Sequence, residues 1–160
     1  METPSEPASP VAITGLTSRG GLSNWVFFAY PERLVMMDLG VGAALKAGAL
    51  AGVGEHGHYG PAPSPRQSVE AWQQQLRAKA RQVVELADDQ VRSVRVHLRM
   101  LAHQLVVVAA DGNPRKLTFM NRDQAQVAIE ALGPRLGDRL AVTTSPIFAF
   151  LRRRAPFLLK

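Results

Sequence analysis

Apolar runs of strand length in the first part of the chain, and alternation of hydrophobic and polar residues further along, indicate antiparallel strands. Residues 24–39 hold two apolar runs separated by "YPER", which predicts a hairpin with Pro31 in its turn. The second run, 34–38, has few polar interruptions, so we expect this strand to be buried on both faces or nearly so. Val11 to Leu16 predicts an earlier strand.

In the second half of the chain, hydrophobic and polar positions alternate with a period of two. Residues 83–86 predict a short strand, and residues 103–120 predict a hairpin around Asp111-Gly112. Between them, apolar and basic residues alternate: Val94, Val96, Leu98 and Met100 on one side, Arg95, His97 and Arg99 on the other. We therefore expect a strand with one basic face.

Two segments have a helical period instead. Apolar residues spaced by three and four predict a helix over about 65–81, with "SPRQ" as its capping box, Ser64 as acceptor and Gln67 reaching back. "NRDQ" caps a second helix through Asn121 and Gln124. Gly133-Pro134 is expected to weaken or bend that helix. Its apolar face consists of Ala125, Ala128, Ile129, Leu132 and Leu136.

Composition is that of one globular domain. The chain has 160 residues, is 46% hydrophobic and contains no cysteine, which excludes disulfide frameworks and cysteine-based zinc sites. "METPSEPASP" (1–10) lacks the basic and apolar runs of a secretory signal and predicts a flexible lead-in. We expect one domain over 11–140 with a glycine-rich and helical insertion at 40–82, and a basic and apolar tail at 141–160.

Two stretches resemble a known family. "YPERLVMMDLG" and "VRSVRVHLRMLAHQLVVVAADGNPRKLTFMNRDQAQVAIEAL" are similar to the strand corner and to the last strands with covering helix of the bacterial pleckstrin-homology-like (PH/GRAM-like) domains. The resemblance implies an α+β fold: about seven antiparallel strands in a curved sheet or barrel, a C-terminal covering helix, and the insertion after the third strand.

The chain departs from that family at its best-known binding site. Eukaryotic members bind phosphoinositides through basic residues in the loop between the first two strands and in the second strand. Here the corresponding loop offers only Arg19, and "NWVFFAY" has no basic residue. The resemblance therefore carries over no binding residue.

The charge balance is compatible with an anionic partner and equally with a soluble, arginine-rich protein that has none. The formal net charge is +6, which suits nucleic acid, an acidic protein surface or anionic lipid. Arg92, Arg95 and Arg99 are the candidate anion-binding residues of the basic strand. The alternative is an exposed antiparallel face that is polar by default.

The tail is the second candidate site. Phe148 and Phe150 stand beside contiguous basic residues, a combination that suits an anionic membrane surface or a partner groove. These basic residues are Arg152, Arg153 and Arg154. Alternatively, the phenylalanines pack back on the domain and leave the arginines solvated.

Motifs for catalysis are incomplete. Gly40 and Gly42 follow an apolar strand, but Leu45 stands where a dinucleotide fingerprint needs its third glycine. "EHGH" (55–58) holds potential metal ligands, which we weigh against a solvated loop. We predict no metal, no cofactor and no catalytic residue.

The leading hypothesis is a cytoplasmic, non-catalytic PH-like module that docks on a partner protein or, peripherally, on the inner face of an anionic membrane. A nucleic-acid-binding accessory protein using the basic strand face is the alternative. A third reading is an unrecognised enzyme or small-ligand binder with the insertion as its lid. No oligomeric state follows from these patterns.

Overall fold

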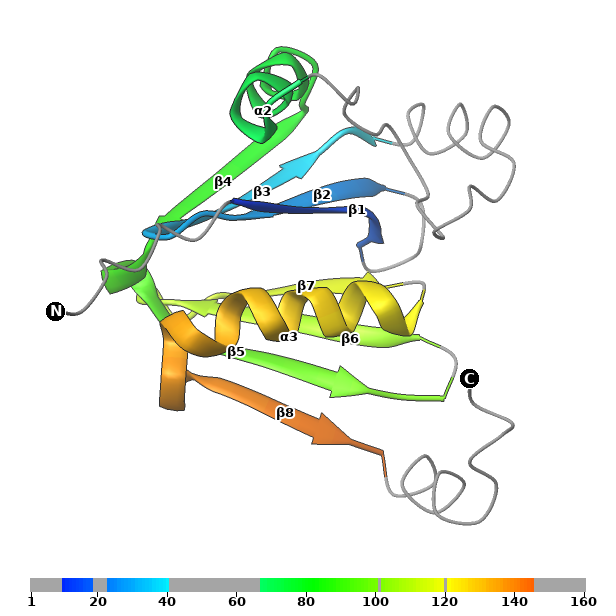
Figure 1. Ribbon diagram of the computed structural model, residues 1–160, viewed down its shortest axis with the longest axis vertical. Coiled ribbons are helices and arrows are strands. Elements are labelled where there is room, and N and C mark those ends of the chain that lie inside the picture. Colours follow the sequence, from blue (N-terminus) through cyan, green and yellow to red (C-terminus); the bar gives the residue numbers. More distant parts are fainter. Residues whose placement is uncertain (1–9, 19–22, 41–66, 101, 120, 146–160) are drawn as a thin grey trace, which may run out of the picture.

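The computed structural model describes residues 10–18, 23–40, 67–100, 102–119 and 121–145. In these residues the strands form one eight-stranded sheet, in the order β4-β3-β2-β1-β7-β6-β5-β8 (Figure 1). Helices α2 (Val69–Arg77) and α3 (Arg122–Leu136) complete the fold. The α+β class and the mostly antiparallel sheet with a C-terminal helix are confirmed, with eight strands in place of about seven.

The first half of the sheet is an antiparallel meander. Its strands are β1 (Val11–Thr17), β2 (Asn24–Ala29), β3 (Arg33–Asp38) and β4 (Gln82–Ala87). The hairpin predicted at "YPER" joins β2 to β3, and the N–H of Tyr30 closes its turn by donating to the carbonyl of Arg33 at 3.0 Å. Residues 34–37 of β3 are buried, as their unbroken apolar run predicted.

The second half contains β5 (Val91–Leu98), β6 (His103–Ala109), β7 (Pro114–Phe119) and β8 (Leu140–Thr144). The β6–β7 hairpin turns around Gly112, whose φ of +80° favours glycine. The chain returns after α3 to add β8 parallel to β5. The sheet therefore continues to Thr144, past the start of the expected tail at residue 141.

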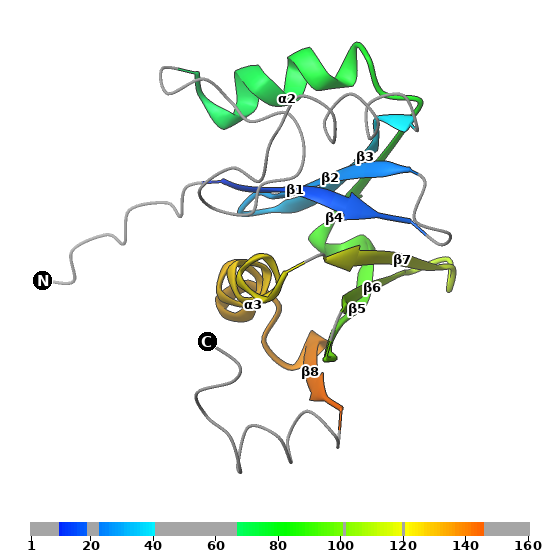
Figure 2. The same ribbon diagram turned by 90° about the vertical axis from the view of Figure 1, so that its right-hand side faces the viewer.

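The two halves meet along a short seam. β1 and β7 share one register pair, Thr17 with Thr118, whereas β1 and β2 share five. Figure 1 shows the halves diverging from this seam, and Figure 2 shows α2 over the outer face of β1–β4 with α3 in the angle between the halves. The shared core lies in that angle.

Hydrophobic residues on the two faces of β2 and β3 enter different clusters. Phe27, Leu34 and Met36 face the main core, which they share with buried residues of β1, β4 to β7 and α3, including Leu132. Leu140 of β8 is partly buried against the same core. Val26, Phe28, Val35 and Met37 face the opposite side and are covered by Trp72 and Leu76 of α2. The insertion therefore contributes α2 as a second layer, which explains why β3 is apolar on both faces.

Both helices begin at side-chain caps. The Oγ of Ser68 accepts a hydrogen bond from the N–H of Ala71 at 3.1 Å, so α2 starts four residues later than predicted and spans 69–77 rather than 65–81. The predicted cap at Ser64 lies outside the described residues. The capping box of Asn121 and Gln124 is confirmed, and α3 continues through Pro134 to Leu136.

Candidate functional site

The outward face of β5 carries the basic residues that the sequence singled out. Val94 and Val96 are fully buried, whereas Arg95 is exposed and His97 is half-buried. Arg99 directly follows the strand and is also exposed. Because strand side chains alternate between faces, Arg95 and His97 lie on the side of the sheet away from the core.

Strand register adds a lysine to this face. Arg95 pairs with Val106 of β6, and Val106 pairs with Lys116 of β7. Lys116 is exposed, so two cations lie in one row about 10 Å apart, two strand spacings across the sheet. The sequence analysis missed Lys116. The sequence did offer a signal: apolar Leu117 and Phe119 alternate with polar residues in the predicted second strand of the hairpin. The hairpin register would then have placed Lys116 level with Arg95.

A second row of polar side chains runs beside the first. Thr143, His97, Gln104 and Thr118 follow one another across β8, β5, β6 and β7. Nδ1 of His97 and Oγ1 of Thr143 are 2.5 Å apart, and Arg99 donates to Oε1 of Gln104 at 3.4 Å. We call the surface formed by Arg95, Arg99, Lys116 and this polar row the basic sheet face.

Ion pairs in the described residues lie elsewhere. Glu85 accepts from Arg33 and from Arg77, each at 3.2 Å, and Asp88 pairs with Arg135. Within the described part of the chain, no carboxylate forms a salt bridge with Arg95, Arg99 or Lys116.

Arg92 is set apart from this face. It lies in the β-bulge where the β5–β6 register shifts between Val91 and Ser93, and its side chain is exposed. Seven residues separate it from Arg99, about 23 Å along an extended strand. The structure thus groups Arg95 and Arg99 with Lys116, and places Arg92 at the other end of β5.

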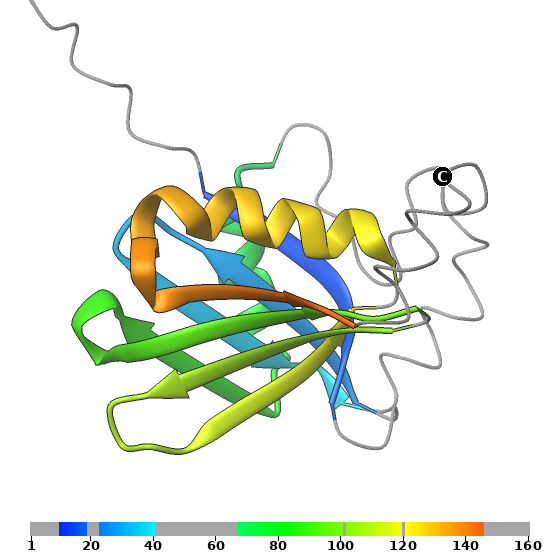
Figure 3. The ribbon, with the colours of Figure 1, turned by 90° about the horizontal axis from the view of Figure 1, so that it is seen from below.

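The tail residues Phe148, Phe150, Arg152, Arg153 and Arg154 lie outside the described residues. Ser145, the last described residue, is held at the end of β5. Its N–H donates to the carbonyl of Leu98 at 2.9 Å, one residue before Arg99. Figure 3 shows β8 ending next to the end of β5.

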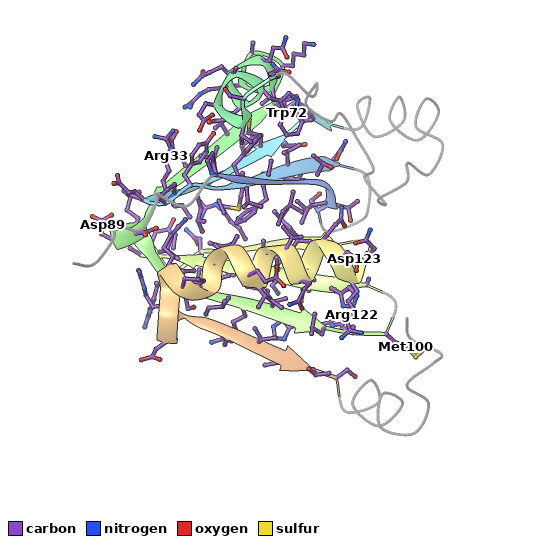
Figure 4. All side chains as sticks on the ribbon, viewed as in Figure 1. Arg33, Trp72, Asp89, Met100, Arg122 and Asp123 are labelled. Atoms are coloured by element: carbon purple, nitrogen blue, oxygen red, sulfur yellow. The ribbon has the colours of Figure 1, made fainter. Side chains whose placement is uncertain are left out.

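An apolar side chain lies at the same end. Met100 follows Arg99, is 51% exposed, and projects where β5 and β8 stop (Figure 4). Large hydrophobic side chains this exposed are few in the described residues. An exposed methionine beside cations combines the two groups that a lipid surface accommodates.

Gly40, the first glycine of the incomplete dinucleotide fingerprint, makes its contacts within the protein. The N–H of Gly40 donates to Oδ1 of Asp38 at 2.7 Å. A Cβ at Gly40 would stand 2.6 Å from Cδ of Arg81, and its φ is +77°. Gly40 therefore serves a tight turn and the close approach of Arg81. Gly42 lies outside the described residues.

A cavity of about 280 Å³ lies between the β2–β3 turn and the end of α3, lined by Val11, Ala29, Tyr30, Pro31, Glu130, Ala131, Pro134 and Arg135. Burial raises the pKa of the Tyr30 hydroxyl, the nearby carboxylate of Glu70 adds to this rise, and that hydroxyl donates to Gln73. Arg135 is already committed to Asp88. The cavity therefore presents no pair of groups arranged for acid and base catalysis.

The described residues show neither a metal-binding cluster nor a membrane-spanning helix. The described part of the chain holds no group of three or more His, Asp or Glu side chains that could hold a metal ion. Glu55, His56 and His58 lie outside it. None of its helices has the length and apolar character needed to cross a membrane.

A scan against protein-family models gives no match to this chain, and a search of curated proteins gives no similar sequence.

Proposed function

We propose that this protein is a non-catalytic, PH-like interaction module that docks on an anionic membrane surface. The observation that carries the proposal is the hydrogen bond from Ser145 to Leu98. It places Ser145, the last described residue, next to the end of β5 and so close to Arg99, at one end of the basic sheet face. We expect the basic and apolar residues that follow Ser145 to extend that face towards the anionic surface.

The expected attraction is moderate. Each basic residue near an anionic surface contributes about 1 kcal/mol, so Arg95, Arg99 and Lys116 together supply about 3 kcal/mol. Arg152, Arg153 and Arg154 bring the total to about 6 kcal/mol. Because the Debye length is about 8 Å at physiological salt, this binding is reversible and depends on ionic strength.

The order of the strands and the position of helix α3 support the PH-like part of the proposal. Two antiparallel meanders followed by a helix that covers the core agree with what the family resemblance implies. The cations, however, lie on β5 and β7 rather than around β1 and β2. We therefore expect recognition of surface charge in general, with no preference for one phosphoinositide head group.

The proposal is tested by co-sedimentation with vesicles of phosphatidylcholine alone and with added phosphatidylserine, at low and physiological salt. The full chain is compared with a chain ending at Ser145, which keeps β8 intact. We expect binding only to the anionic vesicles, reduced at least about 100-fold by the truncation, since the three contiguous arginines, which it removes together with Lys160, are alone worth about 3 kcal/mol. Equal binding to neutral and anionic vesicles, or none to either, would refute the proposal.

Nucleic acid is the second candidate, because the row of Arg95 and Lys116 would also suit a phosphate backbone. Strand faces that bind single-stranded nucleic acid add stacked aromatic rings. Phe27, Phe28, Tyr30, Trp72 and Phe119 are all buried, and Trp25 lies on β2. Duplex binding that survives removal of the tail, with a steep salt dependence, would favour this function over the membrane.

A further inference from the structure

Strand β8 forms a free edge of the sheet. It is hydrogen-bonded to β5 on one side, and among the described residues no strand pairs with its other side. Residues 141–144 are exposed, with Val142 at 45%. A free strand edge presents unpaired N–H and C=O groups to any strand that can approach.

The two edges of the sheet differ in how they are protected. At the β4 edge, the Glu85 carboxylate projects from the strand and pairs with Arg33 and Arg77, and such charges discourage pairing with another strand. β8 reads "LAVTT", with no charge, no proline and no bulge. Proteins usually guard an edge with one of these features or cover it with a helix or loop, and among the described residues none of these protects β8.

The register shows which backbone groups are free. The N–H of Ser145 points to Leu98 of β5, and strand backbones alternate in direction. Ala141 and Thr143 therefore also direct their N–H and C=O groups to β5. The outward-pointing groups are those of Leu140, Val142 and Thr144, with Val142 at the centre of the strand.

We propose that β8 pairs antiparallel with β8 of a second copy of this chain, around a two-fold axis at Val142. In this register Val142 faces its own equivalent, Ala141 faces Thr143, and Leu140 faces Thr144. No charged residue opposes another, and apolar Val142 side chains meet. The outward groups of both strands then form about six ladder hydrogen bonds.

The interface is small, which sets the strength of the dimer. Stable interfaces bury about 1,200–2,000 Å², more than a pair of five-residue strands provides. The dimer is therefore weak and exchanges rapidly in dilute solution. Confinement to a surface, where the effective concentration is high, would favour it.

In this dimer, the basic sheet faces of the two copies point in the same direction. A two-fold axis through an antiparallel pair stands perpendicular to the sheet, so the same faces of both copies lie on one side. The Arg95 side chains of the two copies would then be about 15 Å apart, three strand spacings across. Dimerisation is inferred from β8 alone and stands whether or not the partner surface is a membrane.

Single cysteines test the register, because the chain has no cysteine of its own. Residues facing each other in such a pair have Cα atoms about 5.5 Å apart, within disulfide reach. In full-length protein without lipid, we expect Val142→Cys to form oxidised dimers at least ten times faster than Val127→Cys, a valine 40% exposed on α3. Equal rates would overturn the proposal.

Two further comparisons separate this pairing from other contacts. Ala141→Cys and Thr143→Cys should each cross-link slowly alone and rapidly when mixed, since each faces the other across the axis. Val142→Lys should raise the dissociation constant measured by sedimentation, whereas Val127→Lys should not. If the chain ending at Ser145 cross-links through Val142→Cys and the full chain does not, the tail covers β8 and the two-copy pairing is wrong for the intact protein.

Discussion

The backbone N–H of Arg99 donates a hydrogen bond to Nδ1 of His103, 3.2 Å away, across the connection from β5 to β6. His103 is only 5% exposed. Burial, and to a lesser degree the positive charge of Arg122, lowers the pKa of this histidine below its ordinary value of 6.5. An imidazole that accepts at Nδ1 is neutral, so protonation of His103 would break the contact beneath the basic sheet face.

We predict that acid destabilises the fold through His103. Its contribution is intact above about pH 6.5 and is lost as the pH falls towards the lowered pKa, because the unfolded chain binds the proton first. Urea unfolding between about pH 7.5 and 5.5 should show a falling free energy, by up to about 1.4 kcal/mol per pH unit. His103→Gln should flatten this slope, and an unchanged slope in that variant would contradict the assignment.

Arg135 should matter more to stability than an exposed arginine. Its side chain is 12% exposed and donates to Asp88 and to the carbonyl of Tyr30, joining α3 to the first half of the sheet. We expect Arg135→Met to cost about 3 kcal/mol in urea unfolding. Arg77→Gln, which removes an ion pair whose arginine is 44% exposed, should cost under about 1 kcal/mol. Equal losses would refute this ranking.

Two glycines should respond differently to alanine. Gly112 has a φ of +80° in the β6–β7 turn, so Gly112→Ala should lower the free energy of unfolding by about 1 kcal/mol. Gly133 lies within α3 directly before Pro134, and a Cβ there meets nothing within 4 Å beyond its two chain neighbours. Gly133→Ala should change the free energy of unfolding by less than about 0.5 kcal/mol, because the gain in helix propensity is opposed by crowding of the new Cβ against the Pro134 ring. Thermal unfolding of both variants measures the difference, and an equal loss in both would contradict it.

Neutralising the basic sheet face should weaken vesicle binding more than an equal charge change elsewhere. Arg95→Gln with Lys116→Gln removes about 2 kcal/mol, or roughly 30-fold in partitioning. Arg77→Gln with Lys79→Gln makes the same change in net charge at the α2 end, far from β5 and β7 (Figure 1). Similar losses from both pairs would mean that net charge, and not this face, drives binding.

Features set by neighbouring residues were predictable from the sequence. The turns at Pro31 and Gly112 and the cap at Asn121 depend on a few consecutive side chains, and each appears where expected. The apolar run of β3 correctly indicated burial on both faces, although it did not say that α2 would supply the second cover.

Features set by remote pairing were not predictable. β8 lies more than forty residues from β5, and "LAVTT" has no alternation to reveal a strand, since only Leu140 packs against the core and residues 141–144 are exposed. Lys116 joins Arg95 only through the register of β6 between them. Arg135 reads as one more surface charge at the end of a helix, and its burial depends on Asp88 in another element.

The division of the sheet follows the order in which the chain is synthesised. β1 to β4 are complete once Ala87 has been made, and α2 then covers one of their faces. The other face, with Phe27, Leu34 and Met36, packs against residues of β5 to β7 and of α3, all of which are made later. During translation this half therefore has one apolar side open to chaperones or to aggregation until the second half of the sheet and α3 cover it.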